Sequence, residues 1–80
     1  MHDQDTRTPT EREGLLDSAV LSLLVNEDSH RPWAVEEIER EVHRDTTDSL
    51  WRLQGGGLIH RLDRFVWASR AAVMLDEINV

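Results

Sequence analysis

The absence of cysteine constrains this chain most, because it removes disulfides and thiolate metal sites as means of stabilising a small fold. With 80 residues the chain is too short for two independent cores, and a domain of this size buries only roughly 60% of the surface exposed by its unfolded chain. Stability must therefore come from apolar packing around one core. A hydrophobic content of 39% with three tryptophans is sufficient for such a core.

The same features predict where the protein resides. A chain without cysteine suits a reducing cytosol. Its longest apolar run, residues 71–75, is far shorter than the ~20 residues needed to cross a bilayer. The first ten residues contain no apolar stretch like that of a signal peptide. We therefore expect a cytoplasmic protein with no membrane association.

The first half of the chain predicts a tail, a helix and a short strand. Residues 1–8 are polar and without periodicity, so we expect a disordered N-terminal tail and a single folded domain at 9–80. Thr8 with Glu11, or Thr10 with Glu13, can form a capping box for a first helix. Turn formers at 26–29 end that helix, and Pro32 favours an extended piece at 31–33. The apolar residues at helical spacing are Leu16, Ala19, Val20, Leu23 and Leu24.

The second half predicts two short helices, a hairpin and a last helix. A one-sided helix at 35–42 precedes a turn at 43–44, after which Asp45 can cap a third helix with Leu50 and Leu53 facing inward. Glycines 55–57 end that helix, and the β-prone segments 58–62 and 65–68 predict a hairpin. Ser69 can cap a final helix. The residues expected on the buried side of this helix are Ala71, Ala72, Leu75 and Ile78.

The resulting order is helix, short strand, helix, helix, hairpin, helix, an α+β fold that is mainly α. In this order the sequence resembles the winged helix-turn-helix superfamily, and in particular small winged-helix proteins of actinobacteria. The resemblance covers about residues 11–78. Three segments carry it: Arg31-Pro32-Trp33 leading into Val35-Glu36-Glu37-Ile38, Leu50-Trp51-Arg52-Leu53 through Gly57-Leu58-Ile59-His60-Arg61-Leu62-Asp63, and Phe65-Val66-Trp67-Ala68-Ser69-Arg70-Ala71-Ala72.

Two positions depart from the pattern of that superfamily. Ala34 stands where a serine or threonine often caps the second helix, so Glu37 lacks its usual reciprocal partner. The predicted hairpin corresponds to the wing of that superfamily. At its tip, Arg64 occupies a position where glycine would suit a two-residue turn. We therefore expect a wing loop that is longer than two residues or strained.

The resemblance implies that the third helix enters the major groove of DNA and that the wing follows the phosphate backbone. With Leu50 and Leu53 inward, Arg52 is expected to point outward, with Ser49 and Trp51 on the flanks. The outward Asp48 opposes this function, because a carboxylate repels phosphates. The candidate nucleic-acid-binding residues are Arg44, Thr47, Ser49, Arg52, His60, Arg61 and Arg64.

The tryptophans are better explained by packing than by recognition, with one exception. Trp33 is expected to cover the core and Trp67 to be half-buried on its strand. Trp51 lies on the flank of the third helix. It either packs against the hairpin or anchors a protein partner.

Charge leaves two functions open. The formal net charge of −7 opposes attraction to nucleic acid, yet residues 43–70 hold five arginines against three acids. We therefore expect a small DNA-binding transcriptional regulator that binds double-stranded DNA, and the alternative is an acidic protein-interaction module that does not bind DNA. Spare apolar residues on the first and last helices predict a homodimer; they include Leu15, Leu21, Val25, Val73 and Met74.

Catalysis and metal binding are not expected. The four histidines have no neighbour at metal-ligand spacing, so we predict no metal and no cofactor. Glycines 55–57 lack the lysine of a phosphate-binding loop, and no nucleophile motif or catalytic carboxylate pair is present. The chain is not expected to be an enzyme.

Overall fold

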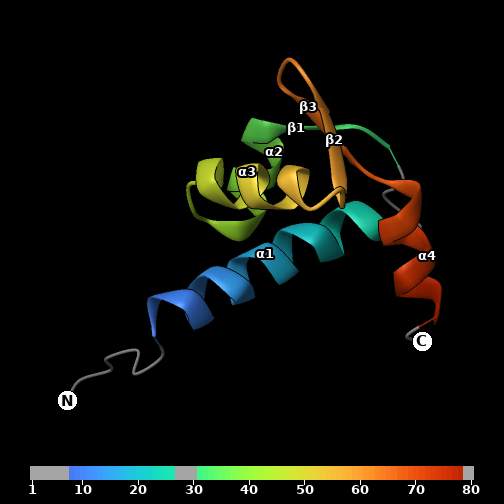
Figure 1. The fold of residues 1–80 in the computed structure, drawn as a ribbon. Coiled ribbons are helices and arrows are strands. Elements are labelled where there is room, and N and C mark those ends of the chain that lie inside the picture. The colour runs from blue at the N-terminus through green and yellow to red at the C-terminus, as the bar shows by residue number, and fades with distance from the viewer. Residues whose placement is uncertain (1–7, 27–30, 79–80) are drawn as a thin grey trace.

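The computed structural model describes residues 8–26 and 31–78, which form four helices and a three-stranded antiparallel sheet (Figure 1). This confirms the predicted α+β class with mainly helical content. The expected tail at 1–8 lies outside the described residues except for Thr8. The elements follow the predicted order: α1 (Pro9–Val25), β1 (Trp33–Ala34), α2 (Val35–Val42), α3 (Thr47–Gly55), β2 (Ile59–Leu62), β3 (Phe65–Ala68) and α4 (Arg70–Ile78).

Thr8 belongs to the fold because it is the N-cap of α1. Its side-chain oxygen accepts a hydrogen bond from the Glu11 backbone N–H at 3.1 Å, and the Glu11 carboxylate accepts one from the Thr8 N–H at 3.4 Å. This reciprocal pair satisfies two of the N–H groups that a helix start leaves without partners. Of the two predicted capping boxes, the structure forms the one between Thr8 and Glu11.

The core lies between α1 on one side and α2, α3 and the sheet on the other (Figure 1). Leu50 and Leu53 face inward as predicted, and Trp33 packs into the same cluster. On α1 the predicted stripe is only partly buried, since Ala19 is exposed. The buried core cluster consists of Val20, Leu24, Trp33, Ile38, Leu50, Leu53, Ile59 and Val66.

The sheet has the order β1-β3-β2. β1 begins at Trp33 and not at Arg31, and it pairs Trp33 with Val66 of β3. In the hairpin Leu62 lies opposite Phe65, so the connecting turn contains two residues. Its first residue, Asp63, has a φ of 56°, a conformation that aspartate tolerates because its short side chain can hydrogen-bond locally.

The turn therefore corrects the expectation of a longer wing loop, and its left-handed residue is Asp63 and not Arg64. Arg64 is not among the described residues with positive φ, so it does not need the conformation for which glycine was expected. Its carbonyl accepts a hydrogen bond from the Val35 N–H at 2.8 Å. The hairpin tip is thereby attached to the first turn of α2.

A Schellman motif ends α3 and directs the chain into the hairpin. The Leu58 N–H bonds to the Leu53 carbonyl and the Gly57 N–H to the Gln54 carbonyl, each at 3.0 Å. Gly57 has a φ of 75°, which a side chain would disfavour. Leu58 then packs against the core beside Leu53. The glycine stop predicted from the sequence thus has a defined geometry.

The last helix, α4, is much less buried than predicted. Ser69 caps it as expected, since its side-chain oxygen accepts a hydrogen bond from the Ala72 N–H at 3.2 Å. However, Ala72 is the buried member of the predicted face, whereas Ala71 and Leu75 are exposed and Ile78 is 73% exposed. The reason is that α4 packs at the C-terminal half of α1 and beside Leu58, and the core cluster contains no residue of α4. Among the described residues, no helix is both long and apolar enough to span a bilayer.

Candidate functional site

The exposed surface of α3 and the β2–β3 hairpin is the candidate site, and α3 is fixed in place by its polar residues. At its start, the Asp45 carboxylate accepts a hydrogen bond from the Thr47 N–H at 2.8 Å, which holds the pKa of Asp45 below its ordinary value. Asp45 thus satisfies the first N–H of α3, but the N-cap is Thr46, whose side chain makes no capping hydrogen bond, so the predicted cap is not formed by Asp45. The buried Thr46 donates both its N–H and its hydroxyl to Glu39 of α2, at 3.0 and 3.3 Å.

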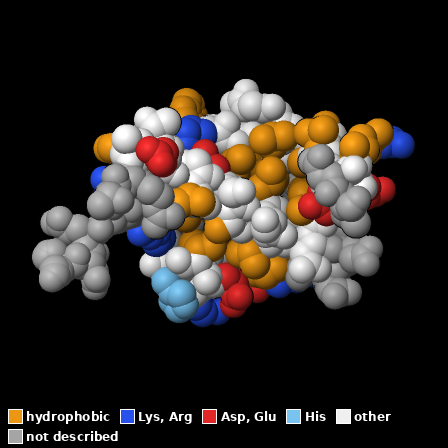
Figure 2. All heavy atoms as spheres, turned by 90° about the horizontal axis from the view of Figure 1, so that it is seen from below, with side chains coloured by type: hydrophobic (Ala, Val, Ile, Leu, Met, Phe, Trp, Pro, Cys, Tyr) orange, Lys and Arg blue, Asp and Glu red, His pale blue; other side chains and the backbone are white. Residues whose placement is uncertain are grey.

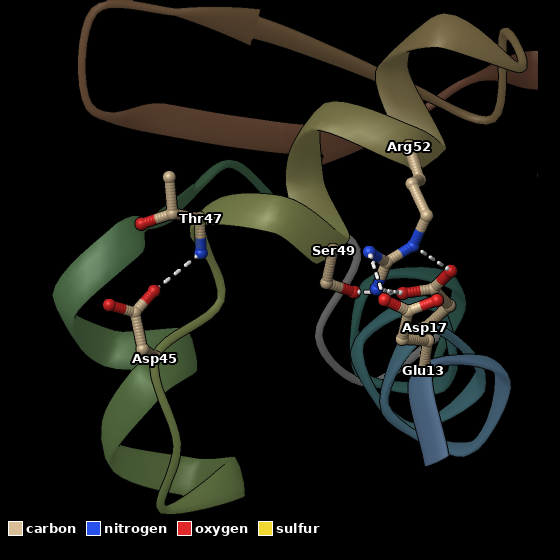
Figure 3. Close-up of polar contacts among 6 residues, drawn as sticks. All are labelled: Glu13, Asp17, Asp45, Thr47, Ser49 and Arg52. Carbon is tan, nitrogen blue, oxygen red and sulfur yellow. Dashed lines mark hydrogen bonds and ion pairs between the residues drawn. The ribbon is translucent and has the colours of Figure 1, made fainter. Parts of the chain in front are cut away.

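Further along α3, Arg52 forms a two-pronged ion pair with Asp17 of α1 (Figure 3). Arg52 Nε lies 2.9 Å from Asp17 Oδ2, and Arg52 Nη2 lies 2.7 Å from Asp17 Oδ1. The buried Ser49 hydroxyl donates to the same Oδ1 at 2.5 Å. These hydrogen bonds, that of Arg52 first, hold the pKa of Asp17 below its ordinary value against the opposing effect of burial.

Glu13 adds a second, weaker acid to this network. Its carboxylate lies 3.6 Å from Arg52 Nη1, and its side chain is more than half exposed. Asp17 and Glu13 lie four residues apart on α1, so both present an oxygen to the same guanidinium (Figure 3). Arg52 is therefore held by α1 and is not a free cation.

This network corrects the predicted orientation of α3. Ser49 is fully buried and not on a flank, and Arg52 points to α1 and not outward. The helix is turned about its axis so that Trp51 is the outward residue, with 77% of its surface exposed. Of the two alternatives for Trp51, packing against the hairpin is excluded because the side chain is exposed, and the role of a partner anchor stays a prediction. The physical reason is that burying Ser49 costs little once its hydroxyl has an acceptor.

The exposed surface of α3 carries no cation. Its exposed residues are Thr47, Asp48, Trp51, Gln54 and Gly55, and the only charge among them is the Asp48 carboxylate. Thr47, one of the predicted nucleic-acid-binding residues, is exposed on this surface. The surface that was expected to read bases presents one aromatic ring and one acid.

The hairpin presents an apolar face with cations near its tip. Residues opposite each other share a face, so His60, Leu62, Phe65 and Trp67 lie together. The His60 and Trp67 rings are 5.9 Å apart, while Leu62 is 66% and Phe65 43% exposed. As predicted, Trp67 is half-buried.

The two hairpin arginines are exposed but make local contacts. Arg61 Nε donates to the Asp63 carbonyl at 3.1 Å. The Arg64 guanidinium lies 5.4 Å from the centre of the Phe65 ring, within cation–π range. Neither has an acidic partner among the residues that the structure describes.

Arg44 lies apart from the other candidates, beside α1. It lines an open groove of about 390 Å³ between α1 and α2, whose floor includes Leu15, Leu16, Leu23 and Val42. The seven predicted nucleic-acid-binding residues thus divide among three places. Thr47 and the hairpin residues His60, Arg61 and Arg64 are exposed; Ser49 and Arg52 bind Asp17; Arg44 lines the groove.

Asp17 and Glu13 are the residues that the sequence reasoning missed. A signal was present, since Asp17 lies three residues before Val20 and four after Glu13, beside the stripe that α1 buries. An acid at the border of a buried stripe indicates a cationic partner elsewhere. The sequence does not say that the partner lies 35 residues away, on α3.

No group of three or more histidine or acidic side chains is placed to hold a metal ion within 8–26 and 31–78. In comparisons with family models, curated proteins and solved structures, the chain matches none.

Proposed function

We propose that the chain is a winged-helix domain that binds another protein through α3 and the hairpin, which is the wing. The fold assignment is supported by the order of elements and by the sheet order β1-β3-β2. These place a short first strand beside the hairpin and two helices in succession before it. Because fold alone does not define a function, the choice of partner rests on the surface.

The engagement of Arg52 with Asp17 is the observation that carries the proposal. Reading guanine in the major groove requires an arginine or lysine whose donors are free to bind two base acceptors. On α3 the single such side chain already donates to both oxygens of Asp17. Releasing it would leave the Ser49–Asp17 contact without its cation and weaken the attachment of α3 to α1.

Trp51 and the hairpin supply what a protein partner would bind. Tryptophan is enriched among the residues that dominate interface energies, because its large rigid ring loses little entropy when it is covered. In this protein Trp51 is exposed on a helix whose backbone is hydrogen-bonded at both ends. Leu62 and Phe65 add exposed apolar area on the hairpin.

Charge specifies the partner further. The chain has a formal net charge of −7, and Asp48 lies on the same helix as Trp51. Electrostatic complementarity therefore favours a partner with a basic group beside an apolar pocket for the indole ring, and with an acidic group where Arg61 and Arg64 of the hairpin meet it. The same charge lowers the affinity for nucleic acid.

The experiment places a photo-crosslinking amino acid at the exposed Gln54, three residues from Trp51 on α3, and, as a control, at the exposed Glu36 of α2. A protein joined from position 54 but not from 36 is then purified and titrated against the unmodified chain. Trp51→Ala should weaken that complex by about 2 kcal/mol or more, and Gln54→Ala should change it little. If the purified protein binds equally well to Trp51→Ala, the proposal is wrong.

A second candidate is DNA binding through the wing alone, which the exposed His60, Arg61 and Arg64 favour. In that case Arg61→Ala and Arg64→Ala should each reduce the salt dependence of affinity by about one unit, for all sequences alike. Titration of labelled genomic and random duplexes at low salt tests this. Absence of binding there removes the candidate. Tight DNA binding that does not depend on Trp51 would instead overturn the protein-interaction proposal.

A further inference from the structure

The face of the molecule opposite the hairpin is unusually apolar for a surface. Figure 2, which views the molecule from below, shows hydrophobic side chains gathered on this face in the region of α1 and α4. Leu15, Met74 and Leu75 are each about half exposed, and Ile78 is more so. Of the spare apolar residues expected to join copies of the chain, Leu15 and Met74 are indeed exposed, whereas Val25 is buried.

Two open grooves flank α1 on this face. The first, between α1 and α2, has an apolar floor and carries Arg12 and Arg44 among its lining residues, together with Glu41. The second, of about 320 Å³, lies between α1 and α4 and is lined by Leu21, Val25, Ala72 and Leu75 among others. The α1 residues between the grooves are short or apolar: Leu15, Ser18 and Ser22 at steps of three and four.

The charges at the two ends of this face are complementary. Arg12 and Arg44 have no acidic partner among the described residues. At the other end, α4 carries Asp76 and Glu77 beside its exposed apolar residues, and neither acid has a cationic partner in the part of the chain that the structure describes. The two arginines outnumber Glu41, so the first groove attracts an acidic, apolar helix.

We propose that a second copy of this chain covers the face, with the two α1 helices antiparallel, so that α4 of each copy occupies the α1/α2 groove of the other. The first groove lies along α1 from Arg12 to Leu23, whereas α4 packs near its C-terminal end and descends past it (Figure 1). A two-fold axis near Ser18 therefore brings each α4 toward the opposite groove. The contact is isologous and closes with two copies.

The small side chains of α1 make this approach possible. Ser18 and Ser22 leave room for two helix backbones to pack closely at the axis, where longer side chains would hold them apart. The apolar residues of α4 then fill a groove that in a single copy faces water. Asp76 and Glu77 lie at the rim with Arg12 and Arg44, and two such sets form in each dimer.

Sedimentation velocity of the full chain between about 1 and about 200 μM tests the proposal, because a dimer of micromolar affinity changes its population over this range. The expected species has twice the 9.3 kDa mass of one chain. A single monomeric species throughout overturns the proposal and leaves the grooves to another partner. Filaments or larger assemblies overturn the two-fold arrangement.

Two charge-reversal variants test the pairing itself. One carries Arg12→Glu with Arg44→Glu, and the other carries Asp76→Arg with Glu77→Arg. Each places like charges at both contacts, which should raise the dimer dissociation constant by about tenfold or more. Mixed together, they restore opposite charges at both contacts, so they should form a heterodimer as tight as the original dimer.

The control reverses two arginines on the hairpin, Arg61→Glu with Arg64→Glu, and has the same net charge as the groove variant. It should dimerise like the unmodified chain. If the control is as monomeric as the groove variant, net repulsion and not the groove explains the loss. If both groove and α4 variants still dimerise, or if their mixture does not reassociate, the groove and α4 are not in contact. Circular dichroism of each variant shows that its fold is intact.

Discussion

Removal of the Asp17 carboxylate should loosen α3 from α1. Asp17→Ala abolishes two charge-assisted hydrogen bonds to Arg52 and leaves the buried Ser49 hydroxyl without its acceptor. Such hydrogen bonds contribute about 1.5–3 kcal/mol when shielded from water. Because Asp17 is 21% and Arg52 32% exposed, solvent screens part of this contribution. We expect a loss of about 2 kcal/mol in the free energy of unfolding.

A double-mutant cycle separates the pair from its surroundings. Asp17→Ala, Arg52→Ala and the double variant are unfolded in urea and followed by tryptophan fluorescence. The coupling free energy between the two residues should be about 1–1.5 kcal/mol. Glu13→Ala is the matched control, because Glu13 approaches the same guanidinium at 3.6 Å but is largely exposed. Its effect should stay below about 0.5 kcal/mol.

The contribution of Asp17 should also depend on pH. Its pKa in the folded protein lies below the ordinary value of 3.8, mainly because Arg52 donates to its carboxylate. A carboxylate with a lowered folded pKa stabilises the protein above its unfolded pKa, and this stabilisation is lost as pH falls through the folded value. The difference between the unmodified protein and Asp17→Ala should therefore be constant near neutral pH and shrink below pH 3.8.

Two results would refute this reasoning. A coupling free energy near zero would mean that Arg52 is solvated and available to a ligand. A pH-independent difference would mean that the effect of Asp17→Ala comes from packing and not from the charge.

Three further predictions concern the fold. Leu50→Ala should cost about 2–5 kcal/mol because Leu50 is fully buried in the core; an unchanged thermal midpoint would mean that the core is assigned wrongly. Gly57→Ala should cost about 1 kcal/mol because of its positive φ, whereas Gly55→Ala, at a helical position with open space around it, should stabilise by about 0.5–1 kcal/mol in the same melts. Ala34→Ser should raise the free energy of unfolding by about 1 kcal/mol, because it supplies the missing side-chain cap of α2 and the other half of the capping box, from the Ala34 N–H to Glu37 at 3.0 Å, is already formed. The urea midpoint should rise, and an unchanged midpoint would show that the serine does not cap.

The order of elements could be predicted because local signals mark it. Thr8 with Glu11, Asp45, the glycines at 55–57 and Ser69 each start or stop a helix through contacts within a few residues in sequence. The prediction at Ala34 is confirmed for the missing side-chain cap but not for Glu37. The side-chain cap is absent, but Glu37 still accepts the Ala34 N–H and also binds Arg31.

The rotation of α3 could not be predicted from its own residues. Periodicity of apolar side chains places Leu50 and Leu53 inward, but it gives no weight to a polar residue that is buried with a distant partner. Ser49 is buried because Asp17 accepts its hydroxyl, and this contact crosses 32 residues. The predicted orientations of Ser49, Trp51 and Arg52 therefore differ from the structure, because all three depend on that rotation.

The face of α4 was predicted wrongly for a related reason. Ala72, Leu75 and Ile78 lie on one side of an isolated helix, and this pattern indicates that they are buried somewhere. It does not indicate that they are buried within the same molecule. In the single chain Ala72 is buried, but Leu75 and Ile78 remain exposed beside a groove that α1 and Leu58 line.

The bond from Val35 to the Arg64 carbonyl bears on the thermodynamics of recognition. A hairpin joined to its neighbours only through its two strands would sample many tilts, and a partner would have to freeze them out on binding. Here the turn itself is tied to a helix, and β1 pairs along the outer edge of β3. The hairpin is thus preorganised, and little conformational entropy should be lost when a ligand covers it. Slow hydrogen exchange at the Val35 amide, as slow as in the strands, would report this rigidity directly.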